Sequence, residues 1–140
     1  MARGSSLSDQ NVIDELNKNF VAVNLNITEQ GFPGLPGLYG WQRAYQLRMA
    51  RHQEGFTTSV VLTPDGKMSL GTSGTGFISE RYTSTCYVPE KYLDFLKVAA
   101  RRYRQLLSIL NSSSSPEEKD IEIAKIKNQI DYETASRVAR

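Results

Sequence analysis

The chain has 140 residues, of which 39% are hydrophobic and 23% charged, a balance typical of one folded globular domain rather than of a disordered chain. The formal net charge of +2 is too small to indicate nucleic acid or an anionic membrane as a partner. A single cysteine, Cys86, excludes an internal disulfide framework and any multi-cysteine metal site. No apolar run reaches the roughly 18 residues needed to span a bilayer, and the first ten residues lack the apolar centre of a signal peptide. The sequence therefore predicts no membrane partner, and it does not indicate a cellular compartment.

The N-terminal part predicts a helix followed by a strand. Ser8 is a suitable N-cap for an amphipathic helix that ends near Asn17, with the acidic Asp9 in its first turn. Along residues 20–27 (FVAVNLNI), every second residue from Val21 to Ile27 is a large aliphatic one. The positions between them hold Phe20, Ala22, Asn24 and Asn26. Strict alternation of this kind predicts a strand.

The middle of the chain predicts a loop, a helix and a hairpin. Residues 31–40 (GFPGLPGLYG) carry glycine at every third position, but so short a run predicts a surface loop rather than a collagen triple helix. A helix is predicted from Trp41 to about Gln53. Residues 55–74 predict a β-hairpin whose turn, residues 63–66 (TPDG), has proline to fix φ, aspartate to bond the local backbone and glycine to accept positive φ.

Two helices are predicted in the C-terminal part, each with proline at its first position. The first begins at Pro89, and its basic stretch over residues 101–104 (RRYR) predicts a solvated face rather than a nucleic-acid contact. The second begins at Pro116, with Ser115 as its N-cap and Glu118 completing a capping box. The apolar stripe predicted for the first helix comprises Leu93, Leu96, Ala100, Tyr103, Leu107 and Leu110. We therefore expect one domain over residues 1–111, followed by a serine-rich linker and a C-terminal amphipathic helix over residues 112–140.

Three stretches, in this order, resemble the thioredoxin-like superfamily, above all a divergent bacterial-type branch of it. They are residues 9–26 (DQNVIDELNKNFVAVNLN), 55–67 (GFTTSVVLTPDGK) and 87–96 (YVPEKYLDFL). The resemblance implies an α/β fold, a thioredoxin-like three-layer sandwich, with an added C-terminal helix and without the first strand of that fold. Since a missing strand leaves an open sheet edge, we expect either the C-terminal helix to cover the edge of the 20–27 strand or two chains to pair across it.

Two departures from the family pattern determine the expected function. The region that matches the family's Cys-X-X-Cys motif, residues 2–9, contains Ser5 and Ser6 but no cysteine, and Thr57 stands where the family has a cis-proline. A dithiol–disulfide cycle requires two thiols within exchange range, which one chain with one cysteine cannot supply. We therefore expect a redox-inactive, thioredoxin-like binding or structural module with a protein partner. With one histidine, His52, and no cysteine or second histidine near it, we expect no metal, and no pattern indicates a cofactor.

Two enzyme alternatives stay open. In the resembled fold, Thr57, Cys86 and Tyr87 would lie in loops at the active-site end, close to the N-terminus of the helix that begins at Pro89. Cys86 is then the candidate thiol of a monothiol redox protein, or an inert cysteine that packs like a small hydrophobe. The other alternative is that the chain is a fragment of a longer thioredoxin-like oxidoreductase whose upstream strand and cysteine pair lie outside this sequence. A homodimer through the C-terminal helix or the open sheet edge is compatible with each of these hypotheses.

Overall fold

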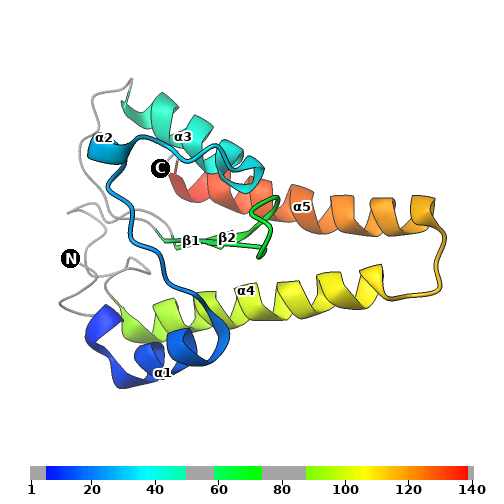
Figure 1. The fold of residues 1–140 in the computed structure, drawn as a ribbon, viewed down its shortest axis with the longest axis horizontal. Helices are drawn as coiled ribbons and strands as arrows, with labels where there is room; N and C mark the ends of the chain where they lie inside the picture. Colours follow the sequence, from blue (N-terminus) through cyan, green and yellow to red (C-terminus); the bar gives the residue numbers. More distant parts are fainter. Residues whose placement is uncertain (1–5, 50–58, 74–87, 139–140) are drawn as a thin grey trace.

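The computed structural model describes residues 6–49, 59–73 and 88–138. These residues combine helices with a small antiparallel sheet, which confirms the coarse α/β expectation. The hairpin lies between two long antiparallel helices, α4 and α5, and α1 and α3 pack on the outer sides of these two (Figure 1). The elements are η2 (Ser6–Ser8), α1 (Gln10–Asn19), α2 (Ile27–Gln30), η3 (Pro36–Leu38), α3 (Tyr39–Met49), β1 (Val60–Leu62), β2 (Ser69–Thr72), α4 (Pro89–Leu110) and α5 (Pro116–Val138), where η denotes a 3-10 helix.

The hairpin forms as predicted. Gly66 N donates to Thr63 O at 2.8 Å, and Gly66 has a φ of 71°, the positive value that glycine tolerates. The strands pair Val60 with Thr72, Val61 with Gly71 and Leu62 with Ser69. The register shifts between Val61 and Leu62, so Leu70 has no partner in the ladder and forms a β-bulge.

Asp65 holds the hairpin turn together through its carboxylate. Its Oδ1 accepts a hydrogen bond from Thr63 Oγ1 at 2.6 Å and another from Lys67 N at 3.0 Å. These bonds, the hydroxyl first, lower the pKa of Asp65 below its ordinary value because they favour the charged form. A carboxyl with a lowered folded-state pKa stabilises the fold above its unfolded pKa, and this contribution is lost as pH falls through the folded pKa. The turn should therefore weaken only in acid, below about pH 4.

Replacing Thr63 with valine is expected to raise the pKa of Asp65 toward its ordinary value, because the nearest donor to the carboxylate is removed. The measurement is an NMR titration of the Asp65 side-chain carbonyl carbon. Thr63→Ser is the matched control: it keeps the hydroxyl and should keep the pKa low. The explanation fails if Asp65 titrates at the same pH in the valine and serine variants.

The core joins α1 to α4. Its buried members are Val12 on α1 and Tyr92, Phe95 and Leu96 on α4. The Tyr92 and Phe95 rings meet edge to face with centroids 5.6 Å apart, and the hydroxyls of Tyr92 and Ser59 are 2.6 Å apart, which connects α4 to the residue before β1. Partly buried hydrophobic residues complete this core: Leu7, Leu16, Phe20, Val61 and Leu93.

The starts of the two long helices were predicted correctly, whereas α3 begins at Tyr39, two residues before the predicted Trp41. Pro89 and Pro116 are the first residues of α4 and α5, and Ser115 Oγ accepts from Glu118 N at 3.2 Å, which confirms the serine N-cap. The predicted N-cap of α1 is wrong by one residue. Asp9, not Ser8, caps this helix, and its Oδ1 accepts from Asn11 N at 3.0 Å and from Val12 N at 3.2 Å. Ser8 ends the 3-10 helix η2, so its backbone is committed to that turn.

The buried face of α4 differs from the predicted stripe. The buried residues of α4 share only Leu96 with the prediction, while Leu107 and Leu110 are exposed. Apolar residues occur at two neighbouring phases of this helix, and its packing against α1, β2 and α5 selects one of them. The buried set is Tyr92, Phe95, Leu96, Ala99 and Leu106.

The predicted surface loop over residues 31–40 is partly wrong, because Gly37 and Leu38 are buried. Gly37 N donates to Gly66 O at 2.9 Å, and a Cβ at Gly37 would lie 2.9 Å from that same oxygen. The backbone of η3 therefore packs directly on the hairpin turn, at a distance that only glycine allows.

The predicted strand over residues 20–27 is wrong. Residues 20–26 lie outside regular secondary structure, and Ile27 is the first residue of α2. Alternating apolar residues form a strand only when a neighbouring strand supplies hydrogen bonds, and the sheet in the described part of the chain contains only β1 and β2.

Candidate binding site

Three residues that the sequence singles out, Thr57, Cys86 and Tyr87, lie outside the described residues, as does His52. Their roles therefore stay predictions. Within the described ranges, no three side chains of histidine, cysteine, aspartate or glutamate gather where they could hold a metal ion. Among those same residues, no helix combines the length and the apolar composition needed to cross a membrane.

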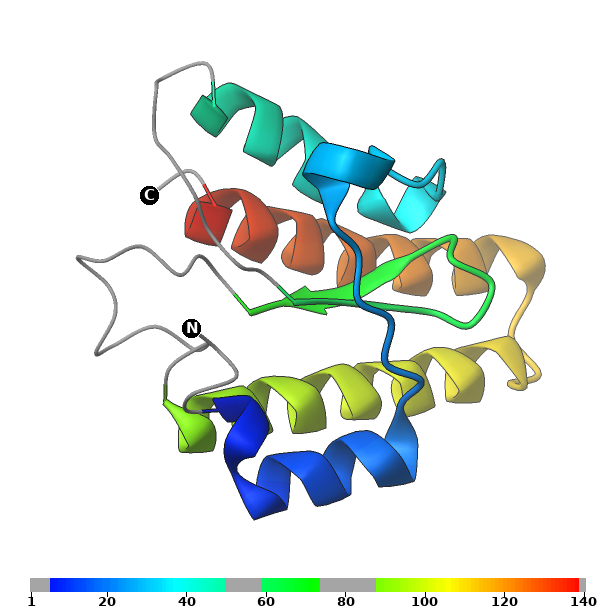
Figure 2. The same ribbon diagram turned by 60° about the vertical axis from the view of Figure 1, so that its left-hand side comes forward.

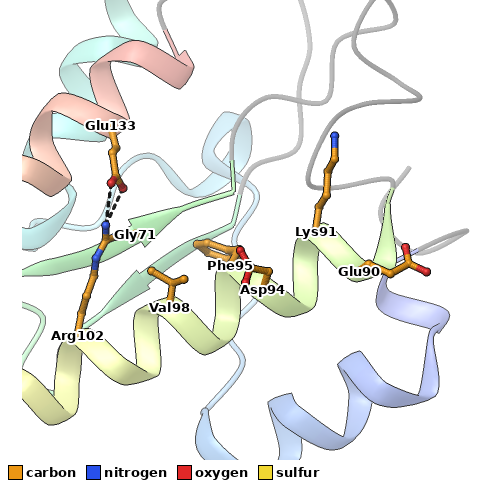
Figure 3. Close-up of a pocket in the computed structure, with 8 residues that line it drawn as sticks. All are labelled: Gly71, Glu90, Lys91, Asp94, Phe95, Val98, Arg102 and Glu133. Carbon is orange, nitrogen blue, oxygen red and sulfur yellow. Dashed lines mark hydrogen bonds and ion pairs between the residues drawn. The ribbon is translucent and has the colours of Figure 1, made fainter.

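A hollow of about 520 Å³ lies between α4, β2 and α5 (Figure 3). At one end, Arg102 Nη2 donates to both carboxylate oxygens of Glu133 at 2.8 Å, and Arg102 Nη1 donates to Leu70 O at 3.0 Å. Leu70 has no partner in the ladder, and the arginine satisfies its carbonyl oxygen. The hollow is lined by Gly71, Glu90, Lys91, Asp94, Phe95, Val98, Arg102 and Glu133.

The chemistry of this hollow is that of a structural junction. None of its lining side chains is a thiol, a hydroxyl or an imidazole, and its charged groups are carboxylates, one lysine and Arg102. The guanidinium of Arg102 is bound to protein acceptors from β2 and α5 rather than turned toward a ligand. The ion pair is partly buried, with side-chain exposures of 14% and 31%, and it joins the two long helices across the hairpin.

An exposed segment joins α1 to α2, and we call it the linking segment (residues 20–26). It crosses the molecule from one helix to the other in front of the hairpin (Figure 2). Phe20 has extended backbone angles, φ −134° and ψ 155°. All residues from Val21 to Asn26 are exposed, with exposed fractions of 93% for Val21, 75% for Val23 and 44% for Leu25.

Within the described ranges, hydrogen bonds hold the backbone of the linking segment at its two ends. Phe20 N donates to Leu16 O at 3.0 Å, and Asn26 N donates to Gln30 Oε1 at 3.0 Å. Between them, no hydrogen bond joins the backbone of residues 21–25 to any other residue that the structure describes. These residues therefore present free N–H and C=O groups to water, as an unpaired edge strand does.

The side chains of the linking segment suit a strand that gains a partner. Its aliphatic residues recur at every second position, which places them on one face of an extended chain. Residues 20–28 contain no charged side chain and no proline, two of the features that proteins use to keep exposed edges from pairing. The alternating sequence pattern identified this stretch, but not that it lacks a partner strand among the described residues.

Comparison with protein-family models, with curated proteins and with solved structures finds no match to this chain. The described residues define a mixture of helices and a two-stranded antiparallel sheet, with the exposed apolar side chains of Val21, Val23 and Leu25 on its surface.

Proposed function

We propose that the chain is a thioredoxin-like domain without dithiol oxidoreductase activity that acts as a protein-binding module. The order of its sequence motifs supports the thioredoxin-like part, as does the succession of a hairpin and the long helix α4. Its single cysteine supports the redox-inactive part, because one chain cannot complete a dithiol cycle. The alternative, a monothiol reaction at Cys86, rests on the sequence alone.

One observation carries the binding role, namely the exposed linking segment. Proteins that recognise extended peptides often let the peptide add as a strand to a free edge. Main-chain hydrogen bonds then give affinity, and alternate side chains give specificity. Residues 21–25 offer both, since no described residue bonds to their backbone and their aliphatic side chains lie at alternate positions. The proposed ligand is therefore an extended segment of a protein.

Proline substitutions in the linking segment test this role. Neighbouring residues of a strand direct their N–H groups to opposite edges, so Val23→Pro and Asn24→Pro each remove a donor from a different edge. Val23→Thr is the control, because it keeps both the N–H group and the β-branched shape. The measurement is selection of a displayed library of random peptides on each immobilised protein.

We expect the wild-type protein and Val23→Thr to enrich peptides with alternating aliphatic residues. At least one of the two proline variants should lose this enrichment by about tenfold or more, and that variant identifies the edge that binds. If both proline variants enrich these peptides as strongly as the wild-type protein does, the proposed binding site is wrong. Rapid reduction of insulin disulfides by the wild-type protein would contradict the redox-inactive part of the proposal.

A further inference from the structure

We propose that the linking segment pairs with the linking segment of a second copy of this chain. The two segments run antiparallel about a two-fold axis at Val23. This inference rests on the proposed function, because it names the partner of the same strand-pairing site. Such a contact is isologous: the same residues contribute from both copies, and the assembly closes as a dimer.

The bounds of the neighbouring helices set the register. The linking segment begins after Asn19, the last residue of α1, and ends before Ile27, the first residue of α2. Val23 is the middle residue of this stretch, so an axis at Val23 places residues 20–26 of one copy opposite residues 26–20 of the other. An axis moved by one residue either way would place a residue of α1 or α2 opposite one end of the segment. Fewer residues of the two segments would then pair with each other.

The sequence is complementary to itself in this register. An axis at Val23 places Val21 opposite Leu25, Val23 opposite Val23 of the other copy, and Ala22 opposite Asn24. Aliphatic side chains thus meet aliphatic side chains on one face, the arrangement that stabilises cross-strand pairs. Since residues 20–28 carry no charge, bringing two identical segments together creates no like-charge repulsion within the strand.

The position of α5 favours a second chain over an internal cover. The sequence predicts that either the C-terminal helix covers the edge of the 20–27 stretch or two chains pair across it. In the structure α5 packs against α3, β2 and α4, and Ile130 near its centre is only 1% exposed. Because residues 21–26 remain exposed, α5 does not cover them.

The size of the contact sets its expected strength. A seven-residue strand is about 24 Å long, and pairing it with its copy buries less than the roughly 800 Å² per partner of a standard interface. We therefore expect a dimer that forms reversibly and depends on protein concentration. A method that traps the paired state is the appropriate test.

Disulfide trapping of single-cysteine variants tests the register. In a Cys86→Ser background, Val23→Cys places two thiols on the axis, where opposite Cα atoms are about 4.5–5.5 Å apart, within disulfide range. Val21→Cys is the matched control: its two copies lie four positions apart along the strand, about 14 Å, too far for a disulfide. Copper–phenanthroline with oxygen oxidises the two thiols, and non-reducing electrophoresis measures the dimer.

We expect at least about ten times more covalent dimer from Val23→Cys than from either Val21→Cys or Leu25→Cys alone. A mixture of Val21→Cys and Leu25→Cys should cross-link, since these positions face each other across the pair. All three positions are exposed, so circular dichroism should show the same helix content in each variant. Equal cross-linking of the three single variants, or none from Val23→Cys at millimolar concentration, would overturn the proposed pairing.

The peptide selection separates the two proposals. If Val23→Cys fails to cross-link while the wild-type protein still enriches peptides through the linking segment, the self-pairing is wrong and the binding role stands. If Val23→Cys fails to cross-link and the wild-type protein enriches no peptides, both proposals are wrong. If cross-linking follows the predicted register, self-pairing is established whatever the peptide selection shows.

Discussion

Replacing Arg102 with methionine is expected to lower the free energy of unfolding by about 2–3 kcal/mol. The substitution keeps a long aliphatic chain on α4, but it removes every donor that reaches Glu133 and Leu70 O from this position. Both acceptors are then left without that donor in a partly buried junction, where water replaces it incompletely. The measurement is urea denaturation followed by circular dichroism.

Arg104→Met is the matched control for this substitution, because Arg104 is an exposed arginine on the same helix. Its expected effect is within about 0.5 kcal/mol. The double variant Arg102→Met/Glu133→Met should lose less stability than the sum of the two single variants, because removing both partners leaves no unpaired carboxylate. Unfolding of Arg102→Met and Arg104→Met at the same urea concentration would show that the ion pair does not stabilise the junction.

The contact of Arg102 with Glu133 was not predicted from the sequence. The stretch of residues 101–104 predicts a solvated helix face, and this is correct for Arg101 and Arg104, which are exposed. It is wrong for Arg102, whose partner Glu133 lies 31 residues away on another helix. The sequence of α4 gives no sign of this pairing, because the pairing depends on how α5 packs against α4 and β2.

The features that were predicted correctly depend on neighbouring residues. The hairpin turn follows from the proline, aspartate and glycine of residues 64–66, and the starts of α4 and α5 follow from Pro89 and Pro116. Each of these residues restricts its own backbone or bonds to a residue close in sequence. Local chemistry of this kind can be read without knowledge of the tertiary structure.

The features that were missed depend on distant partners. Gly37 is buried because the hairpin turn, almost thirty residues later, packs against its backbone. The linking segment has the composition of a strand, but a strand requires a neighbour that composition does not reveal. For the candidate site, the sequence therefore identified the residues of the linking segment and assigned them the wrong state, paired instead of exposed.

The last prediction concerns the buried face of α4 and uses two neighbouring leucines. Leu106→Ala is expected to lower the free energy of unfolding by about 2–5 kcal/mol, because the Leu106 side chain is only 7% exposed and its loss leaves a cavity. Leu107→Ala is expected to cost less than about 1 kcal/mol, because that side chain is already 38% exposed. Both substitutions are leucine to alanine in the same helix, so the change in helix propensity cancels between them.

The pair distinguishes the observed packing from the face that the sequence predicts. The predicted stripe includes Leu107 and leaves out Leu106, so that arrangement requires the opposite order of stabilities. Urea denaturation of the two variants under identical conditions decides between them, with the midpoint of Leu106→Ala expected well below that of Leu107→Ala. If Leu107→Ala proves the less stable variant, α4 is rotated from its position in this structure. The contacts of Arg102 with β2 and α5 would then have to be reconsidered together with it, because Arg102 and Leu106 lie four residues apart on the same face of the helix.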